Sequence, residues 1–144
     1  EKTITLFENQ PLFHNIEIVK KYQSYLPEIF ADPSQIQQVF VNIIMNAADA
    51  MNTKGLLTIS TRSIETNDYV EVSFTDTGSG IPPDKIDRVF EPFFTTKGVG
   101  HGTGLGLSIS YGIIQRHGGN IKVFSRVGEG STFLVTLPKI KEKA

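Results

Sequence analysis

The chain has 144 residues, of which 39% are hydrophobic and 20% charged, and its formal net charge at pH 7 is -1. These values are typical of one globular domain over residues 1–144, and the balanced charge gives no reason to expect nucleic-acid binding. Cysteine is absent, which excludes disulfides, thiolate metal sites and cysteine nucleophiles and favours a cytoplasmic setting. No apolar run approaches the roughly 20 residues that span a bilayer, so we expect no direct membrane contact by this domain, whether or not its parent protein is anchored.

The first residues have the apolar spacing of a helix. Thr3, Ile4, Leu6 and Phe7 follow this spacing, and Pro11 interrupts it. The chain does not begin with Met. We therefore expect residues 1–11 to be the remnant of a connection to a preceding domain.

A strong helix is predicted after two short strands at residues 16–22 and 28–31. Asp32 is suited to cap this helix, Pro33 fits its first position, and Gln35 can complete a capping box. The apolar face of the helix consists of residues at helical spacing, namely Ile36, Val39, Phe40, Ile43, Ile44, Ala47, Ala48 and Met51.

The rest of the chain is predicted to contain two antiparallel hairpins and a second helix. The first hairpin has strands at residues 56–64 and 69–75, the helix covers 103–117, and the second hairpin has strands at 121–126 and 131–137. This order lacks regular βα alternation. It predicts an α+β fold, a two-layer α/β sandwich whose mixed, mostly antiparallel sheet carries helices on one face, in preference to a parallel, doubly wound sheet.

Polar side chains form a stripe on the first helix. Gln38, Asn42 and Asn46 recur every four residues, and Asp49 follows three residues later. The stripe can be a solvated face, but asparagine is a poor helix former, so two of them one turn apart suggest a role. Because carboxamide oxygen suits Mg²⁺, a hard cation that takes few protein ligands beside phosphate oxygens, Asn46 is our candidate metal ligand.

An acidic residue is predicted to point toward the core. Strand alternation places Asp76 on the same face as Phe74, and a buried carboxylate needs either a protein donor or a ligand as its partner. Gly78, Gly80 and Ile81 follow at once. They can form a simple turn, or the glycines can let the backbone approach a bound ring while Asp76 accepts a hydrogen bond from an exocyclic amine.

Alternate glycines lead into the second helix, at Gly98, Gly100, Gly102, Gly104 and Gly106. In a helical turn, Gly104 and Gly106 would each cost about 1 kcal/mol relative to alanine, so backbone N–H groups that bind phosphate at the helix start would explain them. A flexible hinge is the alternative. Neither a Walker loop nor a dinucleotide fingerprint fits these positions. Lys97 can neutralise phosphate charge or be an ordinary surface lysine.

Three phenylalanines occur in the long irregular stretch of residues 77–102. Loops of this length are usually functional. Phe90, Phe93 and Phe94 can belong to the local core or form an apolar latch that contacts a partner domain.

Taken together, these segments resemble the catalytic domain of bacterial sensor histidine kinases, within the superfamily that includes gyrase, Hsp90 and MutL. The resemblance covers roughly residues 31–138. It is carried by an asparagine box at residues 38–47, a first glycine box at 76–82, a phenylalanine box at 90–97, a second glycine box at 102–109, and a closing glycine-threonine element at 130–133.

The resemblance implies the Bergerat fold, with ATP beneath a mobile lid at residues 83–101. It implies that Asn46 binds Mg²⁺ and Asn42 supports the phosphates, while Asp76 receives the adenine amine. The remaining ATP-binding residues that it implies are Gly78, Gly80, Ile81 and Thr132 around the base, and Lys97, Gly102, Thr103, Gly104, Leu105 and Gly106 around the phosphates.

The resemblance also implies a protein-histidine kinase catalytic domain that presents Mg-ATP. Hydrolytic relatives have a glutamate where this chain has Asn42, and a neutral amide cannot act as the base, so we expect little hydrolysis. The implied partners are a histidine-containing dimerisation domain of the same protein, which holds the phosphoacceptor, and a response regulator receiver domain. An ATPase of the same superfamily, a nucleotide-regulated interaction module and a domain without ligand are the alternatives.

Overall fold

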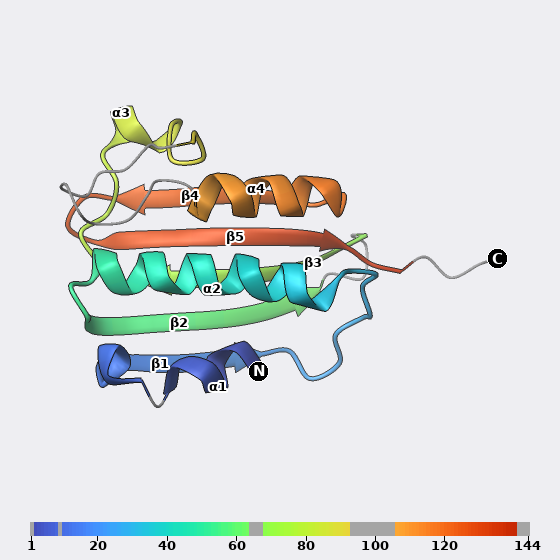
Figure 1. Cartoon of the computed structure of the whole chain (residues 1–144), viewed down its shortest axis with the longest axis horizontal. Helices are drawn as coiled ribbons and strands as arrows, with labels where there is room; N and C mark the ends of the chain where they lie inside the picture. The colour runs from blue at the N-terminus through green and yellow to red at the C-terminus, as the bar shows by residue number, and fades with distance from the viewer. Residues whose placement is uncertain (1, 9, 64–67, 93–105, 141–144) are drawn as a thin grey trace.

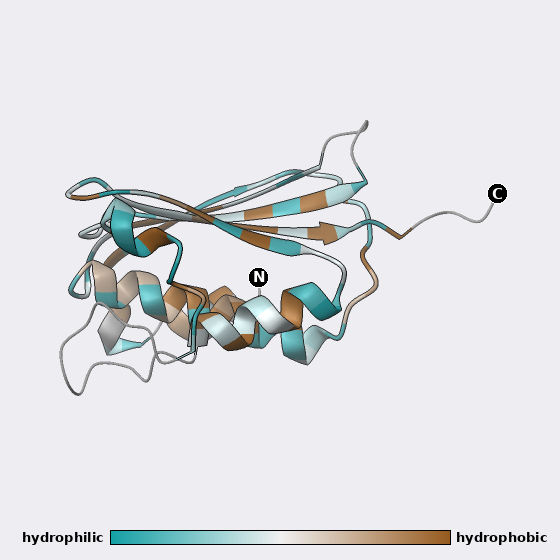
Figure 2. Ribbon diagram, turned by 90° about the horizontal axis from the view of Figure 1, so that it is seen from above, coloured by the Kyte–Doolittle hydropathy of each residue, from teal (hydrophilic) through white to brown (hydrophobic). Residues whose placement is uncertain are grey.

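The fold has two layers, a sheet and a set of helices that cover one of its faces (Figures 1 and 2). The computed structural model describes residues 2–8, 10–63, 68–92 and 106–140. The elements in these ranges are α1 (Lys2–Glu8), a 3-10 turn (Pro11–Phe13), β1 (Asn15–Tyr22), α2 (Pro33–Ala50), β2 (Lys54–Ser63), β3 (Tyr69–Asp76), α3 (Pro83–Ile86), α4 (Gly106–Arg116), β4 (Asn120–Arg126) and β5 (Gly130–Pro138). None of these helices has the length and apolarity to cross a membrane.

The strands of the described residues form one mixed sheet in the order β1-β2-β3-β5-β4. β1 and β2 are parallel, because α2 connects them as a crossover, while the other neighbouring strands are antiparallel. The α+β class and the mixed, mostly antiparallel sheet are thus confirmed.

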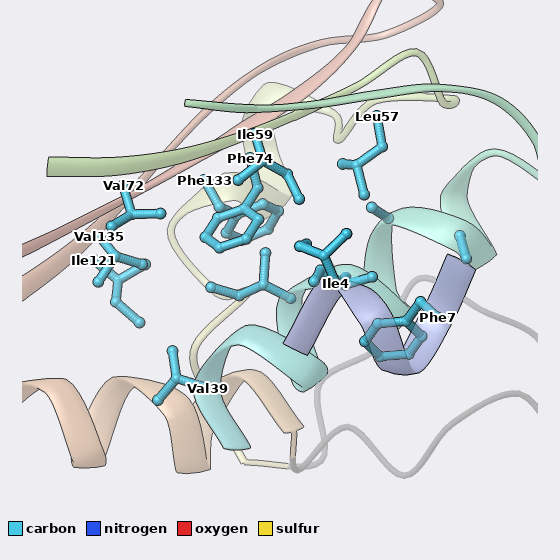
Figure 3. Packing of buried hydrophobic residues seen from close by; sticks show 14 of the residues in the cluster. Ile4, Phe7, Val39, Leu57, Ile59, Val72, Phe74, Ile121, Phe133 and Val135 are labelled. Atoms are coloured by element: carbon cyan, nitrogen blue, oxygen red, sulfur yellow. The ribbon is translucent and has the colours of Figure 1, made fainter. Parts of the chain in front are cut away.

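The core fills the space between the sheet and α1, α2 and α4. On α2, Val39, Ile43 and Ile44 are fully buried, and strand alternation brings residues such as Leu57 and Phe133 to the same layer. Figure 3 shows sheet side chains pointing toward the labelled residues of α1 and α2. The hydrophobic pattern of the sequence therefore determines which face of the sheet the helices cover.

The start of α2 is fixed by a side-chain cap. Asp32 Oδ1 accepts hydrogen bonds from the backbone N–H groups of Ser34 (3.0 Å) and Gln35 (3.4 Å), as predicted. The prediction that Gln35 completes a capping box was wrong, because the backbone N–H of Asp32 donates to His117 Nε2 (3.2 Å) and not to the Gln35 side chain. The hydrogen bond from the Ser34 hydroxyl is the main reason why the pKa of Asp32 lies below its ordinary value.

Two segments differ from the prediction. Residues 28–31 were expected to be a strand, but only an isolated bridge joins Ile29 to Lys139, and the Phe30 side chain is 90% exposed. This segment crosses the end of the sheet, so it lacks a continuous neighbour to pair with. The irregular stretch after Ile81 contains α3, which starts with a proline at its first position.

Candidate nucleotide-binding site

The predicted site residues within the described part of the chain gather around the C-terminal end of β3. Asp76 ends this strand, and the loop of residues 77–81 that follows packs on the last turn of α2, where Ser79 N–H donates to Ala50 O (3.1 Å). α2 carries Asn42 and Asn46 and packs along α4. The two helices and the loop therefore bring the asparagine box, the first glycine box and the start of α4 to one region.

Asp76 is buried and held by the backbone. Its side chain is 2% exposed, and Oδ1 accepts hydrogen bonds from the N–H groups of Gly78 (2.9 Å) and Ser131 (3.3 Å). Oδ2 receives no hydrogen bond from the described residues. The predicted inward direction of Asp76 is thus confirmed, and the described residues engage only one of its two oxygens.

Burial raises the pKa of Asp76 above its ordinary value of 3.8, and the hydrogen bonds from Gly78 and then Ser131 oppose this shift. The cause is desolvation, which disfavours the charged carboxylate. An amine donor from a ligand would replace part of the lost hydration.

The first glycine box is clamped between α2 and the β4–β5 hairpin. A Cβ on Gly80, whose φ is +77°, would overlap the carbonyl of Arg126, and a Cβ on Gly78 would lie 2.7 Å from the Ala50 carbonyl oxygen. Gly128 N–H donates to Ser79 O (2.8 Å) on the same side. These glycines therefore permit close packing between backbone segments, a role that the sequence motif did not indicate.

Asn42 connects α2 to the first turn of α4. Its Nδ2 donates to Gly106 O (3.1 Å) and to Ser110 Oγ (3.0 Å), while its Oδ1 accepts from Gln38 Nε2 (2.9 Å). The buried Ser110 hydroxyl in turn donates to Gly106 O (2.9 Å). Within the described part of the chain, the Asn42 amide is thus engaged in positioning α4.

Asn46 differs from Asn42 in having no hydrogen bond to the described residues, and its side chain is half-buried. No described residue therefore engages its carboxamide oxygen. Gly106 also leaves space, since among the described residues a Cβ there would make only ordinary contacts with the Asn42 side chain, of which the nearest is to Cγ at 3.7 Å.

The closing element is arranged differently from the prediction. Thr132 pairs with Thr75 through their hydroxyl groups (3.0 Å) on the sheet face that the helices leave uncovered, whereas Ser131 is the cross-strand partner of Asp76. The structure thus brings Ser131, and not Thr132, to the Asp76 side chain. The strand alternation of apolar residues such as Phe133 would have indicated this, because Ser131 has the same parity.

Of the three phenylalanines, Phe90 packs as part of the local core. Its ring centroid lies 5.2 Å from that of Tyr111 and 6.4 Å from that of Phe133. The predicted residues that lie outside the described residues are Phe93, Phe94, Lys97, Gly98, Gly100, Gly102, Thr103, Gly104 and Leu105.

Comparisons with known proteins place the chain among signalling kinases. Residues 31–141 match the family model of histidine kinase-, DNA gyrase B- and HSP90-like ATPases. Sensor kinase CckA of Brucella abortus is 44% identical over 90% of this chain and 15% of its own length. This chain spans about a third or less of the length of the curated relatives that it matches.

Solved structures agree with this match. The catalytic domain of histidine kinase ThkA has a TM-score of 0.83 and 34% identity, over 96% of this chain and 88% of that domain. Full-length ShkA in complex with AMPPNP also has a TM-score of 0.83, with 31% identity over 99% of this chain and 30% of its own. ThkA in complex with response regulator protein TrrA has a TM-score of 0.80 and 31% identity, over 96% and 39% of the two chains.

We predict that Gly80→Ala lowers the free energy of unfolding by about 2–3 kcal/mol, because the new side chain meets both an unfavourable φ and the Arg126 carbonyl. The matched variant Gly106→Ala, at a helical position with room for a Cβ, should be as stable as the wild type or up to about 1 kcal/mol more stable. Urea denaturation measures both values. Equal stability of the two variants would contradict the packing role of Gly80.

We also predict that the stability difference between the wild type and Asp76→Asn depends on pH. The raised pKa of Asp76 means that its carboxylate opposes folding at neutral pH, and that this penalty disappears as pH falls through the folded-state pKa and is gone below the ordinary value of 3.8. The wild type should therefore gain stability relative to Asp76→Asn on acidification. Urea denaturation between pH 7 and pH 4 tests this, and a constant difference would count against burial as the dominant effect.

Proposed function

This chain belongs to the family of histidine kinase-, DNA gyrase B- and HSP90-like ATPases and is a histidine kinase catalytic domain, and we propose that it presents Mg-ATP to a histidine of another domain. The observation that carries this proposal is the buried Asp76, whose Oδ1 is held by the backbone while its Oδ2 has no hydrogen bond to the described residues. A purine with an exocyclic amine satisfies that oxygen. The ShkA structure with AMPPNP supports adenine nucleotide as the ligand.

Asn46 fits the part of a magnesium ligand. Its carboxamide is half-buried, has no hydrogen bond to the described residues and extends from the same helix whose last turn supports the Asp76 loop. Hard oxygen donors of this kind suit Mg²⁺, which takes few protein ligands when phosphate oxygens complete its shell. When bound, the ion would neutralise phosphate charge during transfer.

Asn42 favours transfer to another domain over hydrolysis. A general base must accept a proton from water, whereas Asn42 is neutral and uses its N–H groups as donors to Gly106 O and Ser110 Oγ. Phosphoryl transfer depends mainly on positioning and charge neutralisation, so a domain that only binds and orients ATP can serve a nucleophile supplied from outside.

We propose two partners for this domain. The first is a dimerisation domain of the same protein that holds the acceptor histidine, with residues 1–11 as the connection and residues 83–101 as the ATP lid. The second is a response regulator receiver domain, which the complex of ThkA with TrrA supports by analogy.

Mixing the chain with γ-labelled ATP, Mg²⁺ and the separately produced dimerisation domain tests the function. We expect label on the dimerisation domain only when the chain is present. At subsaturating ATP, Asp76→Asn should reduce the labelling rate about 10- to 100-fold, because a charge-assisted hydrogen bond to the base is lost and its nitrogen now opposes the amine.

The matched control is Asp68→Asn, which changes an exposed carboxylate just before the opposite end of β3 and should leave the rate unchanged. ATP binding without labelling would instead indicate a nucleotide-regulated interaction module. Steady release of phosphate without labelling would indicate an ATPase.

We predict that Asn46→Ala makes nucleotide binding insensitive to magnesium. In the wild type, removal of Mg²⁺ with a chelator should weaken ATP binding about tenfold or more, and in Asn46→Ala the affinities with and without Mg²⁺ should converge on the weaker value. Titration calorimetry measures these constants. Gln37→Ala, on the exposed surface of the same helix, is the control, and an undiminished magnesium effect in Asn46→Ala would reject this ligand.

A further inference from the structure

Ser125 of β4 is the centre of a hydrogen-bond network behind Asp76. Its Oγ lies 2.7 Å from the backbone nitrogen of Ile81, 3.0 Å from the carbonyl oxygen of Gly130 and 2.7 Å from Ser131 Oγ. Ser125 thus joins the end of the first glycine box to the strand that pairs with Asp76.

The proton positions in this network follow from the chemistry of its members. A hydroxyl group has one proton to donate and two lone pairs to accept. The Gly130 carbonyl can only accept, so it takes the Ser125 proton, and the Ile81 N–H can only donate, so it occupies one lone pair. The remaining contact requires Ser131 to donate its proton to Ser125.

Ser131 is left as an acceptor beside Asp76. The two residues are cross-strand partners on β5 and β3, which are neighbouring strands (Figure 1), and they are 6% and 2% exposed. The Ser131 backbone N–H already donates to Asp76 Oδ1. A ligand that approaches this pair therefore finds two acceptors, Asp76 Oδ2 and Ser131 Oγ.

We propose that Ser125 is a specificity-determining positioning residue, which retains the Ser131 proton and so makes the base-recognition edge accept hydrogen bonds only. An edge of this kind selects a purine with a 6-amino group, which offers two N–H donors, over a purine with a 6-oxo group, which offers none. This inference rests on the proposed nucleotide function, and adds the source of discrimination between bases.

The size of the effect follows from unpaired acceptors. A 6-oxo group gives no proton to either of the two nearly buried acceptors, and sites built around such hydrogen bonds reject the wrong ligand strongly. In Ser125→Ala the Ser131 hydroxyl becomes free to rotate and can donate to the 6-oxo group. The discrimination should then decrease through tighter binding of the 6-oxo nucleotide.

Titration calorimetry with ADP and IDP, which differ at the 6-position, tests the proposal. The wild type should bind ADP at least roughly 100-fold more tightly than IDP. In Ser125→Ala the ratio of ADP affinity to IDP affinity should be about tenfold smaller than in the wild type. Ser125→Thr keeps the hydroxyl and should have the ratio of the wild type. Ser131→Ala should also narrow the ratio, and Ser125→Ala should then have no additional effect on it.

Ser73→Ala is the matched control, because Ser73 also forms a hydroxyl pair, with Ser60, on the uncovered face of the sheet. The ratio of ADP affinity to IDP affinity in Ser73→Ala should equal that of the wild type. The proposal is overturned if Ser125→Ala folds but its ratio of ADP affinity to IDP affinity is unchanged, or if it loses affinity for both nucleotides equally. If Ser125→Ala fails to fold, an unchanged ratio in Ser131→Ala overturns the proposal. A wild type that binds neither nucleotide refutes the proposed function itself.

Discussion

The site depends on a carboxylate that is taken out of water and held by two backbone N–H groups. Gly78 and Ser131 fix one oxygen of Asp76, and they belong to different parts of the chain, the loop after β3 and the strand beside it. The orientation of the carboxylate therefore depends on the relative position of this loop and this strand. The clamp of Gly78 and Gly80 between α2 and the β4–β5 hairpin provides this constraint.

The two asparagines of α2 illustrate how one residue type serves two purposes. Asn42 has its donors and its acceptor engaged in joining α2 to α4, whereas Asn46, one turn later, has no hydrogen bond to the described residues. The difference arises from what lies opposite each side chain. The first turn of α4 faces Asn42 and offers the Gly106 carbonyl and the Ser110 hydroxyl.

Periodicity in the sequence was sufficient to predict the strands of both hairpins, the long helix and the inward direction of Asp76, because each depends on local alternation of apolar residues. Contacts between distant segments were not predictable in this way. Gln35 was expected to complete the cap of α2, but His117 occupies that position from 85 residues away. The assignment of Thr132 to the base followed the motif, although the parity of β5 places Ser131 beside Asp76. Ser110 and Ser125 have no signal in the sequence apart from their neighbours in space.

The amide of Asn42 also limits how this domain could be converted into a hydrolase. Replacement by an acidic side chain would supply a base, but a carboxylate has no proton to give to the Gly106 carbonyl and would repel it. This would weaken the connection that Asn42 makes between α2 and the start of α4. A single substitution at this position therefore sets a carboxylate against a carbonyl that it repels, although Ser110 Oγ still donates to that carbonyl, and a change to a water-activating base requires a donor between the two groups at the same time.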